Sequence, residues 1–103
     1  MEVIKELSEH IEKELDCAEC YILAATKIND EYPIVAQTYY ALSMNAMDNM
    51  KKLHDAAVTI ITDYRKEKGE PPAPMMVIYD YLHERHIAQA AQIKAMQSMF
   101  NGR

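Results

Sequence analysis

Residues 66–74 read Lys-Glu-Lys-Gly-Glu-Pro-Pro-Ala-Pro. Basic side chains followed by a glycine are typical of the end of a helix, and the prolines that follow cannot continue it. Residues 33–67 would form a helix of about 50 Å, at about 1.5 Å per residue. The connector at residues 70–74 is too short to run back along that helix. The next helix must therefore begin where the previous one stops, which predicts an up-down-up arrangement.

The other break in the chain is Asn29-Asp30, followed by Pro33, whose fixed φ suits the first turn of a helix. The chain has only two glycines, and its four prolines fall in just these two places, so three long segments remain. They predict helices over about residues 2–29, 33–67 and 75–100. We expect one all-α domain covering residues 1–103, folded as a three-helix bundle.

Size and composition exclude several classes of protein. With 103 residues, half of them hydrophobic, the chain is long enough for one core and too short for two. A net charge of −5 would repel phosphate, so we expect no nucleic-acid partner. No apolar run approaches the roughly 20 residues that a membrane helix needs. The first residues lack the basic start and continuous apolar run of a secretory signal, which predicts a cytoplasmic location.

Apolar residues recur at three- and four-residue spacing in every segment, as expected for helices with one face against a core. In the first segment this stripe is Ile4, Leu7, Ile11, Glu14, Ala18, Tyr21, Ala25 and Ile28. In the second it is Val35, Tyr39, Leu42, Ala46, Asn49, Leu53, Ala56 and Ile60. The third offers two stripes, a narrow one (Val77, Tyr81, Glu84, Ala88, Ala91 and Ala95) and a bulkier one (Met75, Tyr79, Leu82, His86, Gln89, Ile93, Met96 and Phe100).

Polar residues interrupt these stripes at about the same height in all three helices: Glu14, Asn49, Glu84 and His86. A charge in an apolar environment is costly unless it is paired, hydrogen-bonded or bound to metal. One interpretation is therefore a single shared polar site. The alternative is that the stripes are ragged, with Glu14 reaching solvent and Asn49 hydrogen-bonding a neighbour.

Two stretches resemble the ferritin-like superfamily, nearest to short rubrerythrin-like and ferritin-like proteins of bacteria and their phages. They are Glu14-Leu15-Asp16-Cys17-Ala18-Glu19-Cys20-Tyr21, similar to the family's first metal-ligand helix, and Tyr81-Leu82-His83-Glu84-Arg85-His86-Ile87, similar to its later one. The resemblance spans nearly the whole chain. It implies a helical bundle that holds iron through Glu14, Glu84 and His86, with Asn49 and His83 beside them, and that oxidises or stores iron.

This sequence departs from the family in its second helix, where the family supplies a Glu-x-x-His ligand pair. The register set by Leu42 and Leu53 puts Ala46 and Asn49 at those two positions. A methyl group cannot coordinate a cation, and an amide is a weaker ligand for iron than imidazole or carboxylate. The resemblance thus implies a degenerate di-metal site with weak or no ferroxidase activity.

The family's fourth helix is missing as well, so a four-helix arrangement would need a second chain, and we expect a homodimer or a larger homo-oligomer. A second apolar face on the middle segment is wider than one hairpin needs and favours an interface: Tyr40, Met44, Met47, Met50, His54, Ala57, Ile61 and Tyr64. The alternative function is accordingly a non-catalytic helical protein that self-associates or binds partners and holds no metal.

Two smaller motifs remain open. Cys17 and Cys20 have the spacing of a metal or redox pair but lack a second ligand pair, and the favoured interpretation is small, half-buried helix residues in a reducing compartment. His83 and His86 lie one turn apart and could hold a divalent metal with Glu84 or Glu14, or could be surface histidines beside the core.

Overall fold

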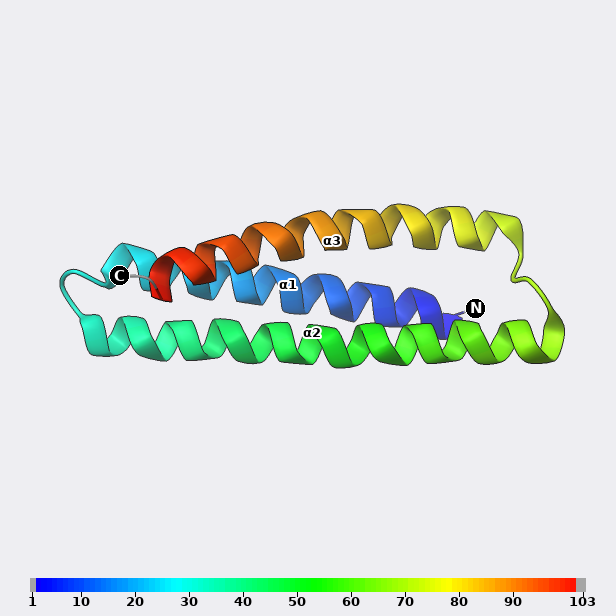
Figure 1. Cartoon of the computed structure of the whole chain (residues 1–103), viewed down its shortest axis with the longest axis horizontal. Helices are drawn as coiled ribbons and strands as arrows, with labels where there is room; N and C mark the ends of the chain where they lie inside the picture. The colour runs from blue at the N-terminus through cyan, green and yellow to red at the C-terminus, as the bar shows by residue number, and fades with distance from the viewer. Residues whose placement is uncertain (1, 102–103) are drawn as a thin grey trace.

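The computed structural model describes residues 2–101, so residues 1, 102 and 103 of the predicted domain lie outside it. It contains three helices, α1 (Glu2–Ile28), α2 (Pro33–Lys68) and α3 (Ala73–Asn101), and the described residues include no strand. The helices run up, down and up in an elongated bundle of 55 × 20 × 18 Å (Figure 1). This confirms the all-α class and the three-helix topology, with every predicted helix end within two residues of the observed one.

The two connections are short for the reasons that the sequence suggests. After α1, the backbone N–H groups of Glu31 and Tyr32 donate to Ile28 O at 3.1 and 2.8 Å, and Pro33 opens α2, where its missing N–H costs nothing. At the far end Gly69 stops α2 with φ +82°, and its N–H donates to Arg65 O at 3.2 Å. The prolines then lead directly into α3.

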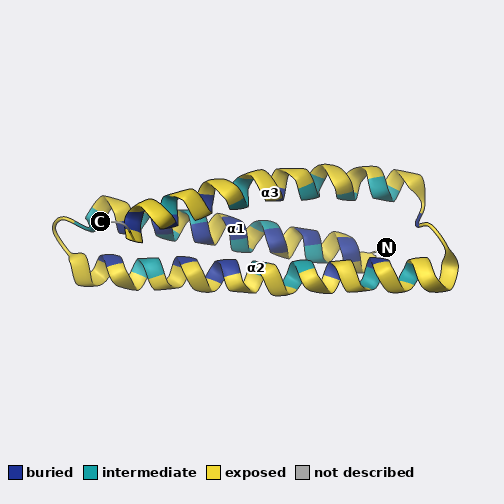
Figure 2. Ribbon diagram, viewed as in Figure 1, coloured by how far each residue is buried: buried dark blue, intermediate teal, exposed yellow. Residues whose placement is uncertain are grey.

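The core lies where α1 faces both other helices, and buried residues line this inner side of the bundle (Figure 2). All eight residues of the predicted α1 stripe are buried or half-buried, as expected. The buried side chains form three clusters along the bundle. They are a central cluster (Ile11, Leu15, Ala18, Ala46, Met47, Ile93), one beside the first turn (Ile22, Ala25, Ala36, Phe100) and one towards the other end (Ile4, Ala57, Ile61).

The predicted core face of α2 is wrong in part. Val35, Leu42, Asn49 and Ala56 are exposed, whereas Met47, Ala57 and Ile61 from the second apolar face are buried. The reason is that one side of α2 packs on α1 and the adjacent side faces α3. The buried residues of α2 therefore come partly from the predicted core stripe and partly from the second apolar face. Much of the surface expected to form an interface is thus used within the chain.

On α3 the bulkier stripe forms the core contact. His86, Ile93 and Phe100 are buried, and the other members of that stripe are half-buried. Every residue of the alanine-rich stripe is exposed, Glu84 among them. Among the described residues, no helix is long and apolar enough to cross a membrane.

Candidate functional site

Glu14 and Asn49 are brought together, in a contact that agrees both with a shared polar site and with the alternative in which Asn49 hydrogen-bonds a neighbour at the surface. Asn49 Nδ2 donates to Glu14 Oε2 at 3.4 Å across the α1–α2 seam. The contact lies at the surface, where Asn49 is exposed, in a shallow pocket of about 430 Å³ that Lys13 and Lys52 also line. Two ammonium groups beside one carboxylate disfavour a cation at this place. Ala46, by contrast, belongs to the central core cluster.

Glu84 and the two histidines near it lie elsewhere. Glu84 is exposed on the alanine-rich side of α3, His86 is buried, and His83 is half-buried. Across residues 2–101, no three His, Cys, Asp or Glu side chains lie close enough to hold a metal ion together. The four polar residues Glu14, Asn49, Glu84 and His86 therefore point in different directions, and within the described residues only Glu14 and Asn49 are hydrogen-bonded to each other.

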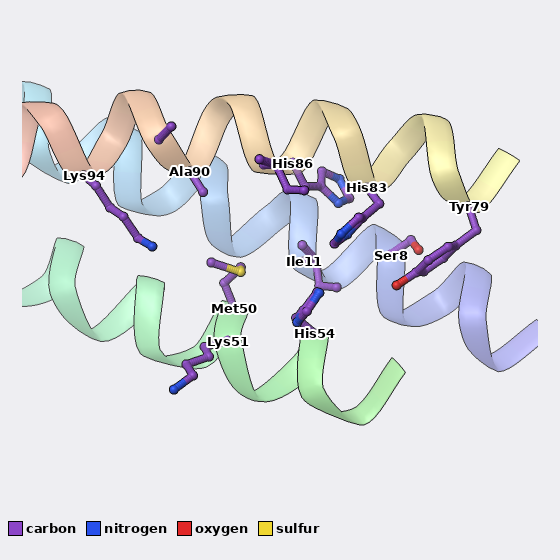
Figure 3. A pocket seen from close by; sticks show the side chains of 12 residues that line it. Ser8, Ile11, Met50, Lys51, His54, Tyr79, His83, His86, Ala90 and Lys94 are labelled. Carbon is purple, nitrogen blue, oxygen red and sulfur yellow. The ribbon is translucent and has the colours of Figure 1, made fainter. Parts of the chain in front are cut away.

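A deeper groove of about 400 Å³ opens between α2 and α3, with α1 as its floor (Figure 3). At one end His83 stacks against two aromatic rings, His54 from α2 at 5.1 Å between ring centroids and Tyr79 at 5.7 Å. Lys51 and Lys94 lie towards the other end of the groove (Figure 3). The space between is lined mainly by apolar side chains from all three helices, including Ile11, Met50 and Ala90.

His86 in the wall of this groove is the unusual residue of the site. His86 is only 7% exposed, and its Nε2 atom has no hydrogen-bond partner within the described part of the chain. Burial lowers the pKa of His86, and the charge of Arg85 and the proximity of His83 lower it further, against opposing effects of Glu12 and Asp16. The imidazole is therefore neutral near pH 7.

Tyr79 complements this environment. Burial and the neighbouring charge of Asp80 raise the pKa of its phenol, which stays protonated and can donate a hydrogen bond. The groove thus combines the neutral side chains of Tyr79 and His86 with the ammonium groups of Lys51 and Lys94, which suits an uncharged or anionic molecule better than a cation.

A buried polar network that the sequence analysis missed connects all three helices. Ser43 Oγ donates to Ala18 O at 2.7 Å, and Gln97 Nε2 donates to Ser43 Oγ at 2.9 Å. Both side chains are buried. The only signal in the sequence is that two polar residues occupy positions near the apolar stripes of their helices, which is too common to identify a network.

Other polar contacts hold α3 on α1. Gln89 Nε2 donates to Asp16 Oδ1 at 2.9 Å, and Arg85 approaches Glu12 at 3.6 Å. Cys17 and Cys20 are free thiols on the exposed surface of α1. The two cysteines contribute to none of the pockets described above.

A scan against protein-family models, a search of curated proteins and a search of solved structures each gave no match to this chain. The class that the fold defines is an all-helical three-helix bundle.

Proposed function

We propose that this protein is a non-catalytic helical module that self-associates through α3. The observation that carries the proposal is the outer face of α3, defined as Val77, Tyr81, Glu84, Ala88, Ala91, Ala95 and Met99. Val77, Tyr81 and Met99 are 68%, 62% and 69% exposed. Because the opposite side of α3 packs on the core, this helix carries apolar side chains on two sides, and an exposed apolar face of this kind is typical of an interaction surface.

A second copy of the same chain fits this face. Tyr81 and Ala95 lie equally far from Ala88 along the helix, so in an antiparallel pair of α3 helices centred on Ala88 each large ring lies opposite a small residue. Small residues allow two helices to approach closely, and such a two-fold contact is self-complementary. Antiparallel pairing also separates the acidic side chains of Asp80 and Glu84, which parallel pairing would bring together.

Light scattering at micromolar concentration tests the proposal. We expect twice the chain mass of 11.9 kDa, and the substitution Tyr81→Glu should reduce it to a monomer that keeps its helical circular dichroism. Val58→Glu is the matched control, since Val58 is an exposed apolar residue on α2. A wild-type chain that is monomeric and fully helical, or a Val58→Glu chain that dissociates as readily, would contradict the proposal.

The resemblance to ferritin-like proteins supports a second proposal, a bundle that keeps a degenerate di-metal site. Its support is the hydrogen bond between Glu14 and Asn49, two of the positions that the resemblance assigns to metal. Against iron chemistry in the unaltered chain stand Lys13 and Lys52 beside Glu14, and the methyl group of Ala46.

Restoring both ligands separates the two proposals. The double variant Ala46→Glu, Asn49→His should unfold more easily without metal, because it buries a carboxylate, and should regain stability with ferrous ion if a site is rebuilt. The unaltered chain should bind no iron under the same conditions. If it binds two irons per site and oxidises ferrous ion, the non-catalytic proposal is wrong.

A further inference from the structure

We propose that charge fixes how two copies of α3 pair: Lys94 of each copy lies between Asp80 and Glu84 of the other. The inference rests on the proposed self-association through the outer face of α3, and it adds what selects the partner and the register. The partner is a second copy of this chain whose α3 runs antiparallel. Because such a dimer is two-fold symmetric, the contact forms twice.

The three charged residues lie on one flank of α3. At about 3.6 residues per turn, Asp80, Glu84 and Lys94 fall within an arc of about 80° around the helix, and all three are exposed. This arc lies where the outer face meets the groove, because Ala91 belongs to both and Lys94 lines the groove. A two-fold axis between antiparallel helices keeps equivalent flanks on the same side. The second copy therefore presents its own three charges beside these.

These charges are not paired within the chain. In the range 2–101 the ion pairs lie elsewhere, and neither Lys94, Asp80 nor Glu84 takes part in one. Lys94 follows the two acids by fourteen and ten residues, about 21 and 15 Å at about 1.5 Å per residue, so it cannot reach them. Asp80 and Glu84 are one turn apart, and like charges at that spacing repel. One chain alone therefore leaves a complementary set of charges unpaired.

The register that places Ala88 opposite Ala88 brings the complementary charges together. In an antiparallel pair, residues equally far from the centre on opposite sides lie at the same level, so Lys94 is level with Leu82 of the second copy. Asp80 and Glu84 of that copy are each two residues from Leu82, about 3 Å along the axis. A lysine side chain is long and flexible enough to cover that distance. The ammonium group would thus lie between two carboxylates and relieve their repulsion.

Other arrangements of two α3 helices lose these ion pairs. Parallel pairing in register places Asp80, Glu84 and Lys94 each beside the same residue of the second copy, so that only like charges meet. Sliding an antiparallel pair by seven residues, the step that restores equivalent faces, moves Lys94 to the level of Met75 or Gln89. Each of these levels is five residues from the nearer acid, about 7.5 Å. The charges therefore select one orientation and one register.

Exchanging the charges between two variants tests the proposal. One variant is Lys94→Glu, and the other is the double variant Asp80→Lys, Glu84→Lys. Each variant alone should have a dissociation constant on the order of tenfold higher than that of the wild-type chain, because like charges then meet twice in the contact. An equimolar mixture should form a heterodimer, since the reversed charges of one variant face those of the other. Sedimentation equilibrium gives the dissociation constants, and native mass spectrometry identifies the heterodimer.

Two further variants control for the effect of charge alone. Lys51→Glu is the matched control, because Lys51 also lines the groove but belongs to α2. It should leave the dissociation constant of the dimer unchanged. Lys94→Gln serves if a reversed variant loses its helical circular dichroism. It should raise the dissociation constant about threefold and reduce its dependence on salt, as expected for the loss of exposed ion pairs.

Failure of this proposal is distinct from failure of the self-association. If the wild-type chain dimerises and Tyr81→Glu dissociates it, but the mixture stays monomeric, the charge pairing is wrong and the α3 contact stands without it. A dimer that Lys94→Gln leaves unchanged, or that Lys51→Glu weakens as strongly as Lys94→Glu does, overturns the charge pairing as well. A wild-type chain that is monomeric overturns both proposals.

Discussion

At the scale of single residues, Ser43 of α2 links its own helix to both α1 and α3 although it is small and uncharged. It is fully buried in α2, donates to a backbone oxygen of α1 and accepts from a side chain of α3. Backbone oxygens within helices are already bonded, so the extra contact with Ala18 fixes the position of α2 relative to α1. Gln97 Nε2 donates to the same hydroxyl, so both hydrogen bonds of the network depend on Ser43.

Replacing Ser43 by alanine should lower the free energy of unfolding by about 1–3 kcal/mol, because the buried amide of Gln97 loses its acceptor. Adding Gln97→Met should recover most of that loss, since no polar atom is then left unpartnered. Urea unfolding followed by circular dichroism measures both. Ser98→Ala, at an exposed position, is the control. Equal midpoints for the single and the double variant would contradict this explanation.

His86 should make the stability depend on pH. Burial lowers its pKa in the folded chain below the ordinary value of about 6.5, so the unfolded chain takes up this proton first as the pH falls. The contribution of His86 to stability is therefore complete above the unfolded pKa and is lost progressively as the pH falls below about 6.5, until the lowered folded pKa is reached.

The measurement is the urea midpoint at several pH values for the wild-type chain and for His86→Phe. The variant should lose less stability between neutral and mildly acidic pH than the wild-type chain does. Other titrating groups are common to both proteins and cancel in the difference. His10→Phe, at an exposed site on α1, is the control. Parallel pH profiles for wild type and His86→Phe would rule out this role.

At the scale of elements, α3 has two candidate core faces and uses the one with larger side chains. Ile93 and Phe100 bury more apolar surface than alanines at equivalent positions could, so packing the bulkier stripe on α1 is favoured. That choice places Glu84 in solvent and His86 in the groove wall. The candidate metal positions are consequently divided between two sides of the helix.

The end of α2 depends on a backbone conformation that only glycine adopts easily. Gly69 has φ +82° and ψ −159°, and nothing lies within 4 Å of where a Cβ would be, so backbone strain alone opposes a side chain there. Gly69→Ala should destabilise the fold by about 1–3 kcal/mol. Thermal unfolding measures this, with Glu67→Ala as a control at the exposed end of α2. A change no larger than in the control would show that the turn adapts.

At the scale of the whole molecule, α1 holds the bundle together. It packs against both other helices, whereas α2 and α3 make little contact with each other and are separated by the groove (Figures 1 and 3). A three-helix bundle of this length has much surface for its volume and limited stabilisation from a single core. Self-association would add buried apolar surface where the chain has most of it exposed, on α3.

If the chain self-associates in its folded state only, its melting temperature should rise with protein concentration by mass action. Differential scanning calorimetry over a hundredfold range of concentration measures the effect. Tyr81→Glu should abolish the dependence, because it places a charge in the proposed contact, and Val58→Glu should retain it. A melting temperature that is the same at every concentration for the wild-type chain would count against a dimer.

The sequence alone determined the three helices, their ends and their order, because proline, glycine and helical apolar spacing act locally. It also determined the face of α1, which has only one stripe. Tertiary structure decided the rest. The faces of α2 and α3 depend on which of two similar stripes buries more surface, and the Ser43–Gln97 network and the groove exist only where residues distant in sequence meet. Local periodicity cannot choose between equivalent faces, since that choice belongs to the packing of all three helices together.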